Sequence, residues 1–299
     1  MAQARTLLAN RDDALVSRVT EGRWRPFWRR MRRSKGAMVG LVILLGLVIT
    51  AITAPLIAPF NPIKVTDDAL FSPGVPYLFG TDQYGRDILS RLIHGARISL
   101  IIGLISVGIA ASCGVVIGLV AGYYSRWVDG VLMWVINVML AVPGILLALA
   151  IVTIRNEPNL TNLMVAVGIS GIPTYARLVR GSVLAAKENL YIDAARVSGA
   201  PTHTILFRHL LPNVIAPVIV AATLGTGTAI LAAASLSFLG LGSQPPSPEW
   251  GRMLSEGRGY LRDQWWISTF PGLAIMLTVL AMNLLGDGLR DALDPRMQR

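Results

Sequence analysis

Charged residues are scarce in this 299-residue chain: Asp, Glu, Lys and Arg make up 15% of it, against about a quarter in average soluble domains. The single cysteine, Cys113, excludes an intrachain disulfide. No G-x-x-x-x-G-K run followed by Ser or Thr occurs, so the chain cannot cradle ATP in the usual way. His94, His203 and His209 lack metal-ligand spacing. The sequence therefore predicts no catalytic residues, no metal site and no cofactor.

Long apolar runs are what the chain has instead. Hydrophobic residues make up 53% of it, and six stretches contain no Asp, Glu, Lys or Arg. A membrane-spanning helix needs about 20 mostly apolar residues. A large soluble protein with buried helices is disfavoured, because runs this long and this free of charge have few soluble counterparts. The sequence predicts an all-α polytopic membrane protein with six transmembrane helices, at about residues 37–58, 97–122, 130–154, 161–182, 212–241 and 269–289.

Two of these spans have irregular features. The fourth has a short uncharged stretch, and it reaches full length only if Arg177 extends its guanidinium to the membrane interface. In the third, Pro143 and Gly144 predict a kink or a broken turn.

Small and polar residues inside the spans predict helix packing. Gly114, Gly118 and Gly122 recur every four residues and share one helix face, which we expect to pack on another helix of this chain rather than on a partner. Asn137 and Asn283 are expected to form interhelical hydrogen bonds rather than to contact cargo.

Basic residues lie mostly on one side of the predicted spans. Most of the 27 Lys and Arg residues precede the first span, follow the last or lie in the segment 184–211. Cytoplasmic flanks collect Lys and Arg, so both termini are predicted to be cytoplasmic and residues 59–96 and 242–268 to be extracytoplasmic loops. The chain then divides into a basic N-terminal segment, 1–36, and a transmembrane domain, 37–299. Topology and acidic lipid headgroups explain the net charge of +10, so no nucleic acid is expected as a partner.

Two charged regions lie outside the spans. The segment 1–36, in which Trp24, Phe27 and Trp28 stand among basic residues, is expected to lie on the inner membrane surface or on a partner protein. The carboxylates of the outer loops are interpreted as solvated, rather than as contacts to cargo or to a partner; they are Asp82, Asp87, Glu249 and Glu256.

The segment 184–211 carries the most informative pattern. Tyr191 to Ser198 is expected to form a short helix, in which alanines allow close approach of another surface. Gly199 is compatible with the left-handed conformation that ends helices, and Pro212 is expected to open the fifth span. Spacing alone leaves open whether this helix contacts a protein or rests on lipid.

These residues resemble the EAA loop of ABC importer permeases. That loop has Glu-Ala-Ala, a glycine four positions after the second alanine, and Leu-Pro before the next span. Here Asp193 replaces the usual Glu, and His209 stands where the general pattern has an aliphatic residue. The resemblance implies the type I ABC importer permease fold and a coupling helix that sits in a groove of an ATPase subunit. The residues implied to couple the spans to that subunit are Asp193, Ala194, Ala195, Gly199, Leu211 and Pro212.

Other stretches resemble the C-type permeases of dipeptide and oligopeptide importers. They include Phe79-Gly80-Thr81-Asp82, the residues 237–251, and the residues 270–295 that close the last span and tail. Phe-Arg-His before Leu-Pro, as at His209, is common in this branch. The resemblance extends over about residues 25–297.

This resemblance implies the membrane-spanning permease subunit of an ATP-driven importer that moves short peptides across the bacterial cytoplasmic (inner) membrane. The chain would not be an enzyme, because partner subunits hydrolyse the ATP. The implied partners are a second permease subunit forming a heterodimer, two ATP-binding subunits, an extracytoplasmic solute-binding protein, the peptide substrate and the lipid bilayer.

Two alternatives stay open, one within the same importer class and one in a different class of transporter. The same importer class could carry glutathione or a metal chelate. An ion-coupled secondary transporter is a distant alternative, because such proteins carry ionisable residues within the membrane and the apolar runs here hold none. The sequence assigns no substrate-contacting residue.

Overall fold

The computed structural model describes residues 24–124, 126–154 and 158–293. Helices dominate these ranges, and the only β pairing within them is an isolated bridge between Thr81 and Asp87. In chain order the elements are α2 (Trp24–Arg33), α3 (Lys35–Ile57), α4 (Ile88–Tyr124), α5 (Arg126–Ala141), α6 (Gly144–Ile154), α7 (Leu160–Ala186), α8 (Leu190–Val197), α9 (Thr202–Thr204), the π-helix η1 (Ile205–Leu210), α10 (Leu211–Phe238), α11 (Trp250–Gly257), the 3₁₀-helix η2 (Arg258–Tyr260) and α12 (Trp266–Leu293).

Four helical segments are long and apolar enough to cross a membrane. They are α3, α4, the continuous helix Thr202–Phe238 that joins α9, η1 and α10, and α12. A fifth candidate consists of α5 and α6, which are bent by 94° relative to each other. The break at Pro143 confirms the predicted kink, since proline removes a helical hydrogen bond. By length and composition the described residues contain four or five candidate spans, and the count of six stays a prediction.

The predicted fourth span, α7, is a 27-residue helix that is not among these candidates. It packs along α4 and also contacts α5, α6 and α10, and many of its residues are buried, Asn162 and Tyr175 among them. A helix shielded from lipid by its neighbours can carry small and polar residues. Arg177 donates a hydrogen bond from Nη2 to Asn137 Oδ1 of α5, at 2.8 Å, which confirms the interhelical bond predicted for Asn137.

The contact between α4 and α7 depends on the glycines of α4. A Cβ at Gly118 would lie 2.6 Å from the carbonyl oxygen of Ala176 and 2.7 Å from Val179 Cβ. Gly114 and Gly122 approach the same helix as closely. The glycine face therefore packs within this chain, as predicted.

Helix α4 begins well before residue 97, the start predicted for the second span. Asp87 caps it, because Asp87 Oδ2 accepts a hydrogen bond from the backbone N–H of Ser90 at 2.8 Å. Its first turns, including Arg91, are buried among the outer loops. The start predicted at residue 97 follows the charge-free run, whereas ion pairs within the chain let Arg91 lie inside this helix.

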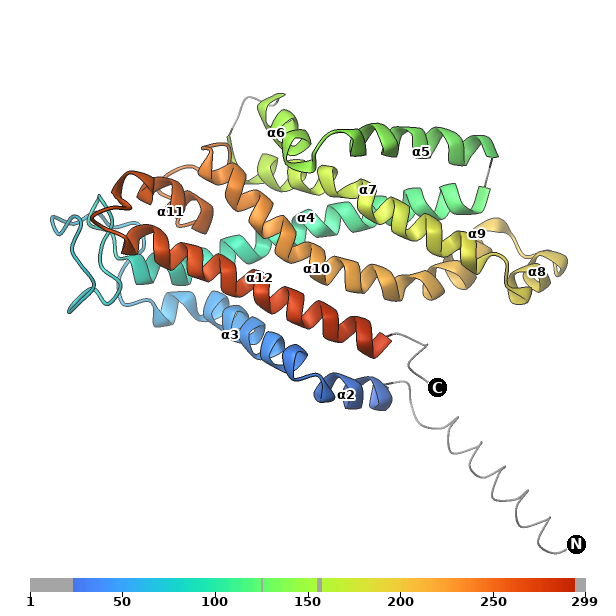
Figure 1. Ribbon diagram of the computed structural model, residues 1–299, viewed down its shortest axis with the longest axis horizontal. Coiled ribbons are helices and arrows are strands. Elements are labelled where there is room, and N and C mark those ends of the chain that lie inside the picture. Colours follow the sequence, from blue (N-terminus) through green and yellow to red (C-terminus); the bar gives the residue numbers. More distant parts are fainter. Residues whose placement is uncertain (1–23, 125, 155–157, 294–299) are drawn as a thin grey trace, which may run out of the picture.

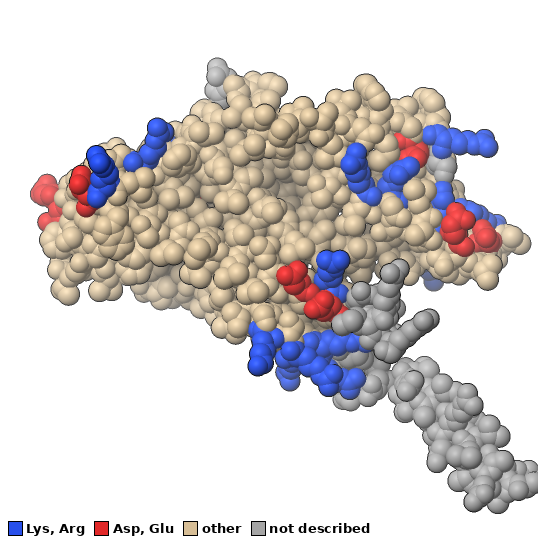
Figure 2. All heavy atoms as spheres, in the orientation of Figure 1, with Lys and Arg blue, Asp and Glu red and all other residues tan. Residues whose placement is uncertain are grey.

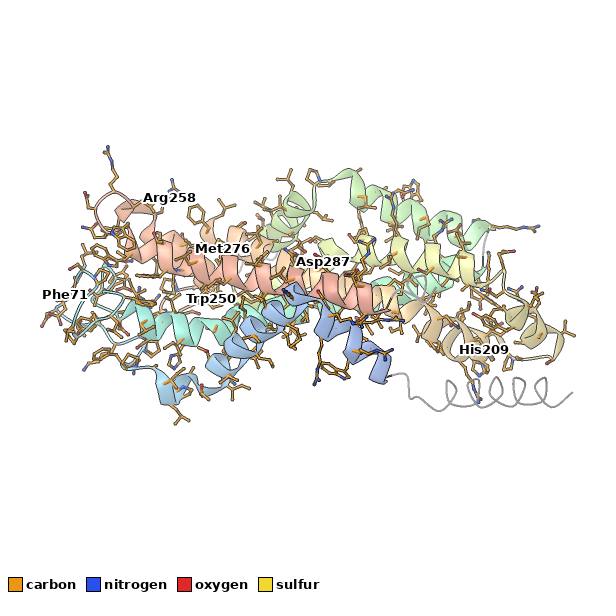
Figure 3. All side chains as sticks on the ribbon, turned by 60° about the horizontal axis from the view of Figure 1, so that its bottom comes forward. Phe71, His209, Trp250, Arg258, Met276 and Asp287 are labelled. Carbon is orange, nitrogen blue, oxygen red and sulfur yellow. The ribbon has the colours of Figure 1, made fainter. Side chains whose placement is uncertain are left out.

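The two ends of the helix bundle carry different elements (Figure 1). One end carries residues 58–87, α11 and η2, and the other carries α8, with α2 beside the end of α12. Phe71 and Arg258 lie at the first end and His209 at the second (Figure 3). Figure 2 shows charged side chains at both ends and along the lower edge, where α2 and the end of α12 lie, with a broad uncharged area between these groups. The loops predicted to be extracytoplasmic thus gather at one end, called the outer end below. The side of the membrane that each end faces stays a prediction.

Candidate functional site

Helix α8 is the short helix expected in the segment 184–211, and a glycine motif ends it. The N–H of Ala200 donates to Ala195 O and the N–H of Gly199 to Arg196 O, both at 3.0 Å. Gly199 has a φ of +73°. These features make a Schellman motif, in which the left-handed residue follows the last helical turn. The spacing of four between Ala195 and Gly199 is therefore the spacing that this helix end requires.

Buried apolar contacts hold α8 against the helices that follow it. Ile192 is fully buried and belongs to one apolar core with Ile205, Leu206 and Leu210 of the π-helix. That core continues into α4, α7 and α10. Helix α8 is therefore packed onto the bundle mainly through the inward side chain of Ile192 and the apolar residues that surround it.

Polar contacts join α8 and the end of α7 to two long helices. The guanidinium of Arg196 lies 5.7 Å from the ring centre of Tyr123, at the end of α4. Lys187 Nζ donates to the carbonyl oxygen of Gly122 at 3.2 Å. Asn213 Nδ2, in the first turn of α10, donates to the hydroxyl of Tyr191 at 3.1 Å. A displacement of α8 would therefore be passed to both α4 and α10.

The outward face of α8 exposes apolar side chains. Leu190 is 86% exposed and Val197 is 89% exposed, and Phe207 of the π-helix is exposed close by in the chain. Asp193 forms an exposed ion pair with Arg196 at 3.2 Å, one turn along the helix. Large apolar side chains in water at the tip of a bundle mark a surface that another protein or lipid covers.

Pro212 stands in the first turn of α10, as predicted, but the chain is already helical before it. The chain is helical from Thr202 to Phe238, and the π-helix leads directly into α10. The N–H of Leu211 accordingly bonds to Leu206 O, five residues earlier. The wider π turn accommodates a proline that lacks an N–H and would crowd the carbonyl four residues before it.

The six predicted coupling residues fall into two groups. Asp193, Ala194, Ala195 and Gly199 lie on α8 or directly after it, and Leu211 and Pro212 begin α10. Sequence reasoning missed the residues that join the groups, Ile192, Tyr191 and Asn213. An apolar residue among polar neighbours could have marked Ile192, but no local signal pairs Tyr191 with Asn213, which are 22 positions apart.

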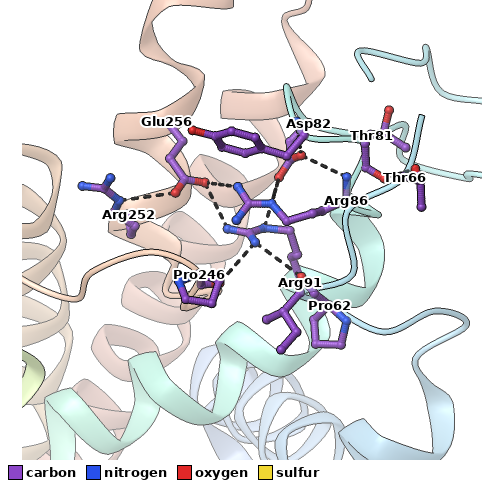
Figure 4. A network of polar contacts seen from close by, with 12 residues as sticks. Pro62, Thr66, Thr81, Asp82, Arg86, Arg91, Pro246, Arg252 and Glu256 are labelled. Atoms are coloured by element: carbon purple, nitrogen blue, oxygen red, sulfur yellow. Dashed lines mark hydrogen bonds and ion pairs between the residues drawn. The ribbon is translucent and has the colours of Figure 1, made fainter. Parts of the chain in front are cut away.

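The carboxylate side chains of the outer loops are buried, so their interpretation as solvated groups is wrong. Figure 4 shows Asp82 and Glu256 with the arginines that bind them. Arg86 binds Asp82 and Glu256, at 2.6 Å in each case. Arg91, which is 1% exposed, lies 3.1 Å from Glu256 and 3.6 Å from Asp82. Two arginines and two carboxylates thus balance each other in charge, which is the condition for keeping such groups out of water. This set of four residues is called the outer network below.

The outer network joins segments that are far apart in sequence. Arg91 Nη1 also donates to the carbonyl oxygens of Pro62 and Pro246, at 3.4 Å each. The network therefore ties the start of α4 to both outer loops and to α11, which carries Glu256.

The two remaining outer carboxylates cap helices. Asp87 caps α4, and Glu249 caps α11 by accepting hydrogen bonds from the N–H groups of Gly251 and Arg252, at 2.8 Å each. Burial raises the pKa of Glu249, and the two backbone bonds act in the opposite direction. All four acidic residues therefore have structural partners within the chain.

A groove of about 770 Å³ lies between α10, α11 and α12. Its lining is mostly apolar and includes Phe238, Met276 and Leu280. Asn283 is exposed on its wall and has no hydrogen-bond partner among the described residues, so the interhelical bond predicted for it is absent there.

Comparison with known proteins places the chain among transport components. Residues 114–299 match the family described as binding-protein-dependent transport system inner membrane component, and residues 22–73 match the N-terminal TM domain of oligopeptide transport permease C. A dipeptide transport system permease protein of Alkalihalophilus pseudofirmus is 47% identical over 280 residues, covering 92% of this chain and 90% of the relative. A di/tripeptide transport system permease protein of Pseudomonas aeruginosa is 47% identical over 279 residues, covering 91% and 92%. A glutathione transport system permease protein of Escherichia coli is 48% identical over 277 residues, covering 92% and 91%.

A solved structure of the MetNI methionine ABC transporter, in an inward-facing conformation, has a similar fold. The TM-score is 0.57 at 19% identity, with 69% of this chain and 98% of that chain covered. This likeness and the helical architecture confirm the predicted fold class. The relatives are named as permease proteins, which confirms a transport subunit rather than an enzyme. The family description confirms the inner membrane as its location. The chain belongs to the family of binding-protein-dependent transport system inner membrane components.

Proposed function

We propose that this chain is the permease subunit of an importer that carries di- and oligopeptides, powered by ATP hydrolysis in separate subunits. The main support for peptides as the cargo class is the identity of 47% to a dipeptide permease over nine-tenths of both chains. The relatives named for dipeptides and for di/tripeptides come from two different bacteria, which supports a peptide as the cargo here.

The chain works with other subunits. Membership of this family implies ATPase partners and a further permease partner. In the finer arrangement that we propose, one second permease of similar fold completes a heterodimer, two ATP-binding subunits drive it, and an extracytoplasmic solute-binding protein delivers the peptide to the outer end.

We further propose that α8 is the segment through which the ATPase subunits move this chain. The observation that carries this proposal is the contrast between the two faces of α8: Ile192 is buried in the bundle while Leu190 and Val197 are almost fully exposed. A helix fixed on one face and uncovered on the other is suited to receive a partner and to pass its motion inward.

The motion has two routes from α8 into the bundle. Arg196 passes it to Tyr123 at the end of α4, and Tyr191 passes it to Asn213 at the start of α10. Since α4 packs along α7 and the first turns of α4 hold the outer network, a tilt of α4 at the α8 end would reach the loops where the cargo is delivered.

The test is ATP-dependent uptake of labelled di- to hexapeptides into vesicles that hold this chain with its genetically neighbouring subunits. Gly199→Trp and Gly240→Trp form a matched pair, because both glycines have positive φ, +73° and +84°, and open space around the Cβ position. Gly199→Trp should abolish uptake while ATP hydrolysis continues, because the ring blocks the surface of α8. Gly240 follows α10 at the outer end, so Gly240→Trp should carry the same backbone strain and retain uptake. Equal uptake by both variants would count against coupling through α8.

Glutathione is the second candidate cargo, because a relative named for it is 48% identical over nine-tenths of both chains. Unlabelled glutathione should fail to compete with labelled dipeptide for uptake if peptides are the cargo. Competition by glutathione at lower concentrations than any dipeptide would transfer the assignment to glutathione and leave the importer class intact.

A further inference from the structure

Helix α2 packs on the rest of the chain by one face only. Met31 is 4% exposed, and Arg30 Nη1 donates to the carbonyl oxygen of Ala292, near the end of α12, at 3.4 Å. The opposite face combines an aromatic ring with three cations, all exposed: Trp28, Arg29, Arg32 and Arg33. Figure 2 shows the basic side chains of this region as a continuous blue group.

The charges of this face are not neutralised within the described part of the chain. Arg29, Arg32 and Arg33 form no ion pair there. The spacing of three and four residues places Trp28 beside Arg32 and Arg29 beside Arg33 on the helix surface. This face therefore presents a concentrated positive charge around one indole ring.

The position of α2 along the membrane normal follows from α3. Only Ser34 separates the two helices, and Ser34 Oγ caps α3 by accepting a hydrogen bond from the N–H of Ala37 at 3.3 Å. At about 1.5 Å per residue, the 23 residues of α3 extend about 34 Å, close to the hydrocarbon thickness of about 30 Å. Since α3 fills the apolar layer, α2 lies at the headgroup level of the leaflet at the α8 end.

We propose that α2 binds the acidic phospholipid headgroups of that leaflet through Arg29, Arg32 and Arg33, with Trp28 at the boundary of the headgroup and acyl regions. Arginine suits this ligand, because its planar guanidinium forms bidentate hydrogen bonds with phosphate oxygens. Indole rings favour the membrane interface. Because α2 is also bonded to the end of α12, a bound lipid would hold the first and last membrane helices together at this surface. This inference is independent of the cargo and of coupling through α8.

The test measures binding of fluorescent phosphatidylglycerol to the purified full-length chain in neutral detergent, with phosphatidylcholine of the same acyl chains as the uncharged comparison. Arg32→Gln combined with Arg33→Gln should weaken phosphatidylglycerol binding by about fivefold for each charge removed, the effect expected for basic residues at an acidic membrane surface. Arg32→Lys combined with Arg33→Lys keeps the charge and should retain most of the affinity. The matched control is Arg258→Gln with Arg262→Gln, which removes two exposed arginines at the outer end and should leave this binding unchanged.

Three results would overturn the proposal. The first is equal affinity of the wild type for both lipids, and the second is an equal loss of phosphatidylglycerol binding in the control at the outer end. The third is unchanged lipid binding in the Arg32 and Arg33 double glutamine variant; if the same variant also loses the ATPase subunits when the assembled importer is purified, the face is assigned to a protein. The proposal would be supported if only the α2 variant binds phosphatidylglycerol more weakly, and if added salt reduces the difference between this variant and the wild type.

Discussion

The outer end and the α8 end of this chain treat charge in opposite ways. At the outer end, Asp82, Arg86, Arg91 and Glu256 are buried and bind one another. On α8, the ion pair lies at the surface and large apolar side chains point outward. A cap that pairs its own charges in its interior keeps its shape alone, whereas α8 is fixed on one face only and leaves a helix face with large apolar side chains uncovered. We propose on this basis a rigid cap at one end and a docking surface at the other.

Breaking the outer network should have the largest effect. Glu256→Gln leaves two buried arginines opposite Asp82 alone, and removing one partner of a buried ion pair costs about 3–5 kcal/mol. Thermal unfolding of the chain in detergent should show this loss. Arg252→Gln is the control, because Arg252 is 20% exposed and lies 3.4 Å from Glu256, so its removal should cost less than about 1 kcal/mol. Similar losses of stability in both variants would mean that burial does not distinguish the ion pairs of Glu256 with Arg86 and Arg91 from its ion pair with Arg252.

The inward face of α8 should be the next most sensitive feature. Ile192→Ala removes a fully buried side chain and should cost about 2–5 kcal/mol, detaching α8 from the bundle. Val197→Ala on the outward face should change the free energy of unfolding by less than about 0.5 kcal/mol. Hydrogen exchange of residues 190–197 would report the local effect, and faster exchange in both variants would show that α8 lacks two distinct faces.

The contact between α4 and α7, through which we propose that the two ends communicate, should respond more moderately. Gly118→Leu places a side chain against the backbone of α7 and should destabilise the chain by about 1–3 kcal/mol through overpacking. Gly108→Leu on the same helix meets nothing within 4 Å and serves as the control. Peptide uptake should fall only for Gly118→Leu; a fall in both would locate the sensitivity in α4 itself rather than in its contact with α7.

The smallest effect on stability should come from the outward face of α8, with the change appearing in assembly instead. Leu190→Ser combined with Val197→Ser should leave the unfolding temperature unchanged and weaken copurification of the ATPase subunits about tenfold, because these exposed side chains are proposed to lie in the interface. Leu78→Ser with Val75→Ser removes the same residue types at the outer end, where both are exposed, and should leave copurification intact.

Local features were predictable from the sequence because neighbouring residues encode them. The kink at Pro143 and the glycine end at Gly199 follow from backbone chemistry at single positions. Four of the predicted spans coincide with long apolar helices. The start of α4 at Ile88 and the π turn before Pro212 were not predictable, because a distant loop stabilises the first and no local rule specifies the second.

Features that depend on distant partners were interpreted wrongly or missed. Asp82 and Glu256 look like solvated loop residues in the sequence, yet they share two arginines although 174 positions separate them. The composition of α7 gives a weak span signal because its neighbours, rather than lipid, surround much of it. The candidate coupling residues were found from the resemblance, whereas Ile192, Tyr191 and Asn213, which join α8 to the bundle, needed the structure.

The central claim is that α8 docks on an ATPase subunit, and cross-linking tests it most directly. Cys113 is the only cysteine, so Cys113→Ser gives a background in which Val197→Cys or Val75→Cys is the single thiol, both at highly exposed positions. A short thiol-to-amine cross-linker should join Val197→Cys to an ATPase subunit in membranes holding the assembled importer, with a yield that changes when ATP is added. Val75→Cys should give no such product. A cross-link to the ATPase from the outer position, or none from α8 in an importer that still transports, would contradict the account.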